Sequence, residues 1–364
     1  MSRGKIEGSG RSGRAGRYEL RRHRERNETV YAAVDLGTNN CRLLIARPTR
    51  RGFRVAGSFS RIVRLGEGLA ETGCLSQRAM DRTVEALKIC AGRMRSHDVR
   101  FSRNVATEAC RRAANCGEFM DRVAAETGLT LETITSQEEA RLAVAGCRNL
   151  FRRGASRALV FDIGGGSTEL IWVDYADDGS YEIEDILSLP YGVVTLSERC
   201  GGDVTPPVYA ELVAEVSEML RPFDLANRIA DHIASGDIQV LGTSGTVTTL
   251  GAVHLGLRRY SRTRIDGLDV GFDSLVETGK ELAALGYRDR VAVPCIGAER
   301  AELVVPGSAI LEAIRNTWPV SEIRIADRGL REGMLLELMA SSRSRREPGA
   351  SPGAATAEIR PSPR

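Results

Sequence analysis

The sequence predicts an α/β protein of two related domains that face each other across a cleft. Three observations lead to this fold class. The chain has 364 residues, which exceeds one ordinary small domain, so two domains are expected. Short β-branched and apolar runs alternate with segments of helical periodicity from residue 29 to residue 340. A strand, an Asp-apolar-Gly turn and a second strand occur twice, about one domain length apart.

The first half of the chain alternates between strands and helices. Apolar residues at helical spacing, such as Met80, Val84 and Leu87, predict its longest helix, and Gly128 is expected to end a shorter one. The predicted elements are strands at 29–34, 42–46 and 104–106, and helices at 77–96, 118–126 and 136 to about 150.

The second half repeats this alternation with more helices. The predicted strands are 157–161, 169–173, 238–241 and 322–326, and the predicted helices are 208–221, 224–234, one from about 246, 298–316 and 329–340. We expect Pro306-Gly307 to interrupt the helix at 298–316, because proline removes a backbone donor.

The ends of the chain differ from its body in charge. Residues 1–28 carry nine Lys and Arg against four acids, and residues 341–364 carry five against two. Such polar ends cannot bury enough surface to fold, so they are expected to be solvated tails or arms that contact polyanions. The predicted organisation is a disordered arm at 1–28, domains at 29–138 and 139–340, and a disordered tail at 341–364.

Composition argues against several functional classes. No apolar run is long enough to span a membrane, and the basic N-terminal arm lacks the apolar core of a secretion signal. The eight cysteines are scattered without a CxxC pair, which predicts reduced thiols rather than a zinc site or disulfides. We therefore expect a cytoplasmic protein with neither a membrane nor a nucleic acid as its partner.

Each repeated turn places an aspartate, Asp35 or Asp162, at the end of a strand beside small residues. Glycine leaves no Cβ between a phosphate and the backbone N–H groups, so the second turn is a candidate anion cradle. Asp162 would hold hydrated Mg²⁺, which prefers one or two carboxylates together with water and phosphate oxygens. A tight hairpin also needs Gly and Asp, but the paired occurrence favours a binding function. The expected cradle consists of Gly164, Gly165, Gly166, Ser167 and Thr168.

A third Gly-rich turn at 241–246 follows a strand and precedes a helix. Its helix N-terminus is suited to an anion, while Ser244 or Thr246 is equally suited to cap the helix. A similar junction at 326–333 has a purely structural interpretation.

The acid/base and cationic candidates have competing interpretations. Ser136-x-x-Glu139 has the spacing of a capping box, which makes Glu139 either a capping residue or a general base at a helix start. Glu169 directly follows the second turn. Because the chain has only three lysines, arginines must supply charge for an anionic substrate. Arg111 and Arg112 could clamp a phosphate or could be surface charge.

In order and spacing, these motifs resemble the bacterial exopolyphosphatase/guanosine pentaphosphate phosphatase family, over about residues 29–340. The resemblance implies two actin-like, ribonuclease-H-like domains with the active site between them. It also implies Mg²⁺-dependent hydrolysis of a terminal phosphoanhydride in polyphosphate or guanosine pentaphosphate, and a homodimer. The matching motifs are Asp35-Leu36-Gly37-Thr38-Asn39-Asn40, Ala106-Thr107-Glu108-Ala109-Cys110-Arg111, Ser136-Gln137-Glu138-Glu139-Ala140-Arg141, Asp162-Ile163-Gly164-Gly165-Gly166-Ser167-Thr168-Glu169, Gly242-Thr243-Ser244-Gly245-Thr246 and Gly329-Leu330-Arg331-Glu332-Gly333.

The resemblance also implies roles for individual residues. Glu139 corresponds to the general base for the attacking water, and Glu169 to a second essential carboxylate. The metal positions are Asp162 and Asp35, and the phosphate-binding positions are Asn39, Arg111, Gly164, Gly165, Gly166, Ser167, Thr168, Ser244 and Gly245.

The chain departs from the family pattern in two ways. Its first hairpin reads Thr38-Asn39-Asn40 where relatives often have Ser-Asn-Ser, and its core ends near residue 340 where longer relatives add a helical region. The shorter core favours short polyphosphate or the nucleotide. An actin-fold ATPase or kinase and a non-catalytic regulator that binds alarmone or polyphosphate are the alternatives. The sequence leaves open the preferred substrate and chain length, the oligomeric state and the role of the tails.

Overall fold

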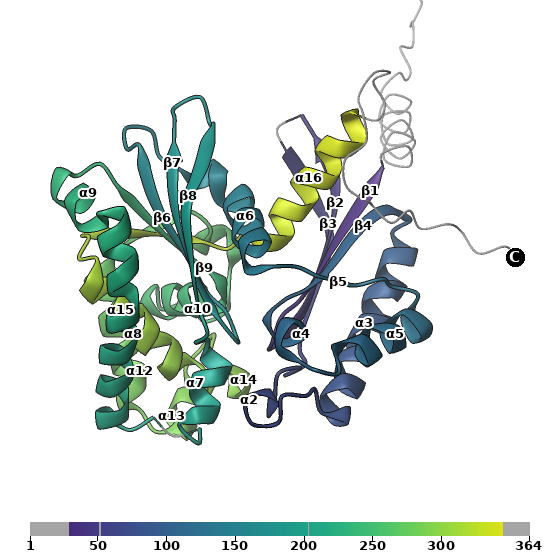
Figure 1. The fold of residues 1–364 in the computed structure, drawn as a ribbon, viewed down its shortest axis with the longest axis horizontal. Helices are drawn as coiled ribbons and strands as arrows, with labels where there is room; N and C mark the ends of the chain where they lie inside the picture. The colour runs from purple at the N-terminus through teal and green to yellow at the C-terminus, as the bar shows by residue number, and fades with distance from the viewer. Residues whose placement is uncertain (1–28, 51, 203, 345–364) are drawn as a thin grey trace, which may run out of the picture.

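The computed structural model describes residues 29–50, 52–202 and 204–344, which form two sheets with helices on both faces (Figure 1). The predicted basic tails lie outside the described residues, except that the last helix continues through Ser344. In this part of the chain no helix is both long enough and apolar enough to cross a membrane.

The first sheet has the strand order β3-β2-β1-β4-β5. The first three strands in the chain form an antiparallel meander, β4 pairs in parallel with β1, and β5 pairs in parallel with β4. The predicted strands correspond to β1, β2 and β4, whereas the long edge strand β3 was not predicted. The strands are β1 Val30–Leu36, β2 Asn40–Thr49, β3 Gly52–Ile62, β4 Val99–Ala106 and β5 Glu132–Thr133.

The second sheet repeats this plan in the order β10-β11-β9-β6-β7-β8. Strands β6, β7 and β8 form the antiparallel meander, and β9 and β11 add in parallel. The internal repeat predicted from the two Asp-apolar-Gly turns is therefore present in the topology. The strands are β6 Arg157–Ile163, β7 Thr168–Tyr175, β8 Tyr181–Leu189, β9 Gln239–Thr243, β10 Leu268–Gly271 and β11 Glu322–Ala326.

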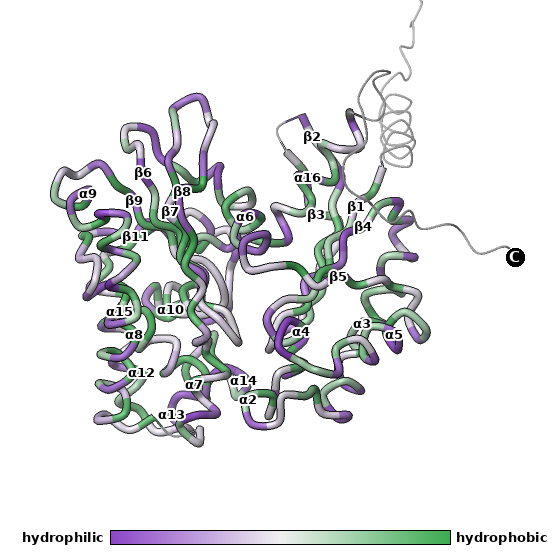
Figure 2. The backbone as a smooth tube through the Cα atoms, in the orientation of Figure 1, coloured by the Kyte–Doolittle hydropathy of each residue, from purple (hydrophilic) through white to green (hydrophobic). Residues whose placement is uncertain are grey.

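Helices cover both faces of each sheet. One face of the first sheet packs on α3 (Gln77–Ser96) and α5 (Cys116–Thr127). One face of the second sheet packs on a large apolar cluster, and Figure 2 shows the hydrophobic strands β6, β7 and β9 at its centre. That cluster includes residues of α8 Pro206–Asn227, α10 Ser244–His254, α12 Phe272–Ala284 and α15 Val304–Thr317.

Two helices lie between the sheets and cover their other faces (Figure 1). Helix α6 (Ser136–Cys147) packs on the second sheet, and α16 (Leu330–Ser344) packs on the first. The helices cross closely, because a Cβ on Gly333 would lie 2.0 Å from the Leu142 carbonyl oxygen. The last helix of the chain thus returns to the first sheet, and the predicted boundary at 138/139 falls in the first turn of α6. The division into 29–138 and 139–340 stays a prediction.

The remaining helices are short and lie in the connections between these elements. They are α2 Leu69–Thr72, α4 Glu108–Arg112, α7 Val193–Arg199, α9 Ile229–Ser235, α11 Arg262–Ile265, α13 Tyr287–Ala292 and α14 Ala298–Ala301, with a 3₁₀ turn at Arg148–Leu150.

Two predicted helix breaks lie elsewhere than expected. Helix α8 continues through Pro222 and ends at Asn227, and the next residue, Arg228, has a left-handed φ of 51°. The break in the predicted helix at 298–316 lies at residues 302–303, before Pro306. Pro306 is in the first turn of α15, where an N–H has no intrahelical partner to lose.

Candidate active site

A cavity of about 690 Å³ lies between the two sheets. Its walls come from the two repeated hairpin turns, the β9–α10 turn and the β11–α16 junction. All four segments follow strand ends, where backbone groups leave the sheet ladder and are free to contact a ligand. The predicted residues in its lining are Asp35, Asn39, Glu139, Asp162, Gly164, Gly165, Gly166, Ser167, Ser244 and Gly245.

The first hairpin turn presents side chains whose polar atoms have no partner. Thr38 and Asn39 are 5% and 7% exposed, and their Oγ1 and Oδ1 atoms are buried without a hydrogen bond in the described structure. Their backbone carbonyls, by contrast, accept hydrogen bonds from the segment after β3, including Gly66 N at 3.0 Å. A buried polar atom without a partner is costly, so these two atoms point to a ligand that supplies one.

The second hairpin turn presents backbone instead. Its carbonyls are engaged, since Val193 N and Val194 N donate to the carbonyl oxygens of Gly164 and Gly165 at 3.0 and 2.8 Å. In the described residues no hydrogen bond uses the N–H groups of Gly165 or Gly166. A Cβ on Gly166 would lie 2.4 Å from Thr38 Oγ1, so the two turns are in direct contact. Only glycine allows this approach.

Glu139 is held by an arginine rather than by its own helix. Arg111 Nη1 donates to Glu139 Oε2 at 2.7 Å. The capping-box expectation is wrong, because the N-cap of α6 is Thr135, whose hydroxyl accepts from Glu138 N at 3.1 Å. The Glu139 carboxylate is therefore free of a capping role and lines the cavity.

Burial raises the pKa of four carboxyl groups around the cavity. The pKa of Asp162 rises to about 6, and that of Glu169 to about 7 because the Asp162 charge adds to burial. Burial and the Glu169 charge raise the pKa of Glu139 well above its ordinary value, although Arg111 opposes them. Burial also raises the pKa of Asp35. Carboxylates with a pKa near neutrality are suited to accept a proton during a reaction.

The remaining predicted residues have supporting roles. Glu169 is 3% exposed, and its Oε1 accepts from Ser167 Oγ at 2.7 Å and Ser188 Oγ at 3.0 Å. Thr168 does not line the cavity, because its hydroxyl donates to the Tyr191 carbonyl at 2.7 Å. Ser244 donates to the Ile163 carbonyl and so joins the third turn to the end of β6.

Arg111 and Arg112 are neighbours in the sequence but have different surroundings in the structure. Arg111 donates to Glu108 Oε2 at 2.8 Å as well as to Glu139, so it is already neutralised by two carboxylates. Arg112 is exposed, and neither arginine lines the cavity. Helix α10 has no side-chain cap, so neither capping alternative of its turn is present.

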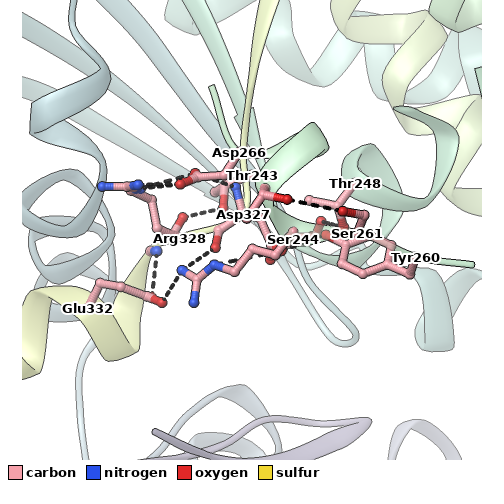
Figure 3. Close-up of polar contacts among 12 residues, drawn as sticks. Thr243, Ser244, Thr248, Tyr260, Ser261, Asp266, Asp327, Arg328 and Glu332 are labelled. Atoms are coloured by element: carbon pink, nitrogen blue, oxygen red, sulfur yellow. Dashed lines mark hydrogen bonds and ion pairs between the residues drawn. The ribbon is translucent and has the colours of Figure 1, made fainter. Parts of the chain in front are cut away.

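Sequence reasoning gave no role to the six arginines that line the cavity, which are Arg42, Arg93, Arg262, Arg300, Arg328 and Arg331. Arg42 pairs with Asp35 across the β1–β2 ladder, so the first hairpin contained a signal for it. Arg300 and Arg331 come from distant segments that only the fold brings together. Near Arg331, Tyr260 donates to Asp327 Oδ2 at 2.6 Å (Figure 3). Arg262 Nη2 donates to the Asp327 carbonyl oxygen at 2.6 Å.

The donor set around Asp35 and Asp162 fits a hard divalent cation. The described residues contain no cluster of three or more His, Cys, Asp or Glu that could enclose a metal by themselves. Mg²⁺ needs no such cage, since it is held by one or two carboxylates with water and substrate phosphates. The two half-buried carboxylates and the unpartnered Asn39 Oδ1 supply oxygen ligands of the required kind.

Comparisons with known proteins converge on one family. Residues 44–342 match the model of the Ppx/GppA phosphatase family. The guanosine-5'-triphosphate,3'-diphosphate pyrophosphatase of Aeromonas salmonicida is 30% identical over 319 residues, which cover 87% of this chain and 60% of that protein's length.

Solved structures give the same result. The crystal structure of an exopolyphosphatase-like protein has a TM-score of 0.75 at 28% identity, covering 85% of this chain and 98% of that one. The Aquifex aeolicus member of the Ppx/GppA family has a TM-score of 0.68 at 25% identity, covering 86% of this chain and 98% of that one.

Proposed function

The chain belongs to the Ppx/GppA phosphatase family, and we propose that it hydrolyses terminal phosphoanhydride bonds, releasing orthophosphate from inorganic polyphosphate, guanosine pentaphosphate or both. Its two-sheet α/β architecture is the actin-like fold of that family. The curated relative is named for the nucleotide and the solved relative for the polymer, and the chain spans about 60% of the former's length.

One observation carries the proposal. Glu139 lies beside an anion-binding surface, with its pKa raised and its carboxylate held by Arg111 at 2.7 Å. A carboxylate in this position accepts the proton of a water molecule as the water attacks the terminal phosphorus. Arg111 orients Glu139, and the Glu169 charge raises its affinity for that proton.

The two hairpins are suited to hold the substrate. The free N–H groups of Gly165 and Gly166 bind phosphate oxygens, and the unpartnered Thr38 hydroxyl donates to the same anion, whereas Asn39 Oδ1 only accepts and so would contribute to the cation site. Asp162 and Asp35 would hold Mg²⁺. When bound there, this ion would neutralise phosphate charge and favour the ionised form of both aspartates.

The proposal is tested by orthophosphate release from polyphosphate, guanosine pentaphosphate and ATP, each supplied separately with Mg²⁺. Wild type is expected to release phosphate from one or both of the first two, and Glu139→Gln to reduce release by at least 10²-fold, the range of general-base catalysis. Glu118→Gln, at an exposed position in the first turn of α5, is the matched control.

Other outcomes would favour other functions. Turnover of ATP alone, unaffected by Glu139→Gln, would favour an actin-fold ATPase or kinase. Binding of polyphosphate or guanosine pentaphosphate without phosphate release from any substrate would favour a non-catalytic regulator.

A further inference from the structure

Two charged residues of the α6 motif have no part in the proposed reaction. Glu138 and Arg141 lie in the same motif as Glu139, but neither lines the cavity. Both form ion pairs with residues of other elements instead. These contacts belong to a network, called here the α6 network, that consists of Arg103, Glu132, Glu138, Arg141 and Glu337.

Arg103 of β4 joins three elements around the start of α6. Its guanidinium group donates to Glu132 of β5 at 2.7 Å, to Glu138 of α6 at 2.8 Å and to Glu337 of α16 at 3.4 Å. Each of its three nitrogens thus contacts a carboxylate from a different element. The planar guanidinium group presents its donors in a fixed geometry, so it also fixes the positions of these carboxylates relative to one another.

Arg141 is the second cation of the α6 network. Its Nε donates to Glu138 Oε2 at 2.7 Å, and its Nη2 donates to Glu138 Oε1 at 2.9 Å and to Glu337 Oε2 at 3.0 Å. A single exposed ion pair contributes little to stability, but several charges in a network restrain one another. Glu138 is therefore held by two arginines, and its backbone N–H donates to the Thr135 hydroxyl at the helix cap.

The side chain of Glu139, in contrast, has Arg111 as its one hydrogen-bond partner among the described residues. Arg111 Nη1 donates both to Glu139 Oε2, at 2.7 Å, and to the Ile134 carbonyl oxygen, at 3.0 Å. A displacement of the helix start by about 1 Å would lengthen the contact with Glu139 beyond hydrogen-bond range. The position of this carboxylate thus depends on what holds the first turn of α6.

Helix α16 lies against α6 along the whole length of the shorter helix (Figure 1). A Cβ on Gly333 would lie 2.0 Å from the Leu142 carbonyl oxygen, and one on Gly146 would lie 2.1 Å from the Gly329 carbonyl oxygen. Residues 329, 333 and 337 follow one another at intervals of about one helical turn. One line of residues therefore contacts α6 from its last turn, at Gly146, to its first turn, where Glu337 joins the α6 network.

We propose that Arg103 is a positioning residue for Glu139. Together with Glu337, it holds Glu138 and so keeps the first turn of α6 where the Glu139 carboxylate remains on Arg111. This inference rests on the proposed function, in which Glu139 accepts the proton of the attacking water.

The test compares Arg103→Gln and Arg103→Lys with wild type, with tripolyphosphate and Mg²⁺ as substrate and cofactor. Without the Arg103 charge, three carboxylates face the guanidinium group of Arg141 alone, and their repulsion displaces the helix start. Arg103→Gln is expected to lower kcat by roughly 10²-fold, the scale of a displacement of about 1 Å, and to leave KM within about twofold of wild type. Arg103→Lys keeps the charge and is expected to recover part of the rate.

Arg324→Gln is the matched control, because it removes comparable ion pairs without contacting α6. The Arg324 side chain is 20% exposed, against 23% for Arg103. It donates to both carboxylate oxygens of Asp269 at 2.8 Å and to the Leu150 carbonyl oxygen at 2.8 Å. Arg324→Gln is expected to lose stability in urea and to keep the wild-type kcat and KM.

Three results would overturn the proposal: a wild-type kcat in Arg103→Gln, a rise in KM that accounts for its whole loss of activity, or an equal loss of kcat in Arg324→Gln. If Arg103→Gln does not fold, the same comparison is made with Glu138→Gln, which leaves Arg103 its other two carboxylates. That variant is again expected to lower kcat without raising KM, and a wild-type kcat in it would contradict the positioning role.

Failure of the proposed function would be distinguishable. If wild type hydrolyses no phosphoanhydride, a double-mutant cycle of Arg111→Gln and Glu139→Gln in urea unfolding still measures the contact between these two side chains. Their coupling free energy is expected to fall by at least half in the Arg103→Gln background and to stay unchanged in the Arg324→Gln background. Equal coupling in all backgrounds would show that Arg103 does not position Glu139.

Discussion

The two hairpins share a turn and a topology, yet they offer different chemistry to a ligand. The first presents the unpartnered side-chain oxygens of Thr38 and Asn39. The second presents free glycine N–H groups, and beside it the carboxylate of Glu169 is already held by two hydroxyls. The first hairpin thus offers side-chain oxygens without a partner. The second offers backbone N–H groups beside a carboxyl group that two hydroxyls already hold in place.

The charges that surround the hairpins differ in the same way. Asp162 has one cation, Arg42, which lowers its pKa, and its own charge raises the pKa of Glu169 and Glu139. Asp35 has two cations, Arg42 and Arg331, which lower its pKa against the effects of burial and of Glu332. Of the two equivalent aspartates, Asp162 is thus the one beside the acid/base candidates, and Asp35 is the one with two cations.

The largest expected effect comes from exchanging these aspartates for asparagine. Asp162→Asn is expected to lower kcat by roughly 10³-fold, the scale of losing a major electrostatic contact. The loss of kcat in Asp35→Asn is expected to be about tenfold smaller, because Arg42 and Arg331 still attract phosphate there. Removing the Asp162 charge also lowers the pKa of Glu169, so residual activity is expected to persist to lower pH. Initial rates from pH 5 to 9 test this, and equal losses without a shift would contradict it.

The next contrast concerns the glycines of the two turns. A Cβ on Gly166 would lie 2.4 Å from Thr38 Oγ1, whereas one on Gly37 would have no neighbour closer than 3.8 Å. Gly166→Ala is therefore expected to separate the hairpins and reduce kcat/KM by roughly 10²-fold, since a displacement of about 1 Å is enough. Gly37→Ala is the matched control and is expected to stay near wild type. Comparable losses in both variants would show that the contact between the turns is unimportant.

A third contrast predicts stability changes of opposite sign. Thr38→Val removes a buried hydroxyl without a partner, so the free energy of unfolding is expected to rise by about 1 kcal/mol while kcat/KM falls. Ser167→Ala removes a hydrogen-bond donor to Glu169, so the free energy of unfolding is expected to fall by about 1 kcal/mol. Urea unfolding of both variants measures the difference. Destabilisation by Thr38→Val would contradict the assignment of its hydroxyl to a ligand.

The smallest effect is a pH dependence of stability, to which Glu169 and Asp162 of the second hairpin contribute. Folding raises the pKa of Glu169 to about 7 and that of Asp162 to about 6, whereas both are near 4 in an unfolded chain. Between about pH 4 and pH 7 the folded protein binds more protons than the unfolded chain. The free energy of unfolding from these groups therefore falls as the pH rises through this window.

The side chain in Glu169→Gln carries no charge at any pH, so the free energy of unfolding of this variant is expected to fall less as the pH rises. Urea unfolding at pH 5 and pH 7.5 measures it, with the exposed Glu182→Gln as control. An unchanged slope in Glu169→Gln would show that burial does not raise the pKa of Glu169.

Local patterns predicted much of the fold and part of the site. The strands at both hairpins, the glycine turn and the position of Glu139 at a helix start are local features, and the structure has all of them. The cap of α6 was assigned one residue late, because Thr135 and Ser136 have the same capping chemistry. Strand β3 was missed because its alternation is weak and both of its faces are partly exposed.

The remaining site residues depend on long-range packing. Arg331 enters the cavity only because α16 returns from the second sheet to pack on the first. Likewise, spacing in the chain assigns Thr168 to the glycine turn, whereas its register in β7 directs the hydroxyl to the Tyr191 carbonyl. Neither position could be derived from spacing in the chain.

In the proposed reaction, water activated at Glu139 attacks the terminal phosphorus of a phosphoanhydride held between the two hairpins. Hydrolysis of tripolyphosphate in ¹⁸O-labelled water with Mg²⁺ shows which phosphorus the water attacks. One labelled oxygen is expected in the released orthophosphate and none in the pyrophosphate. Label in the pyrophosphate, or phosphate release that takes up no label from water, would contradict it.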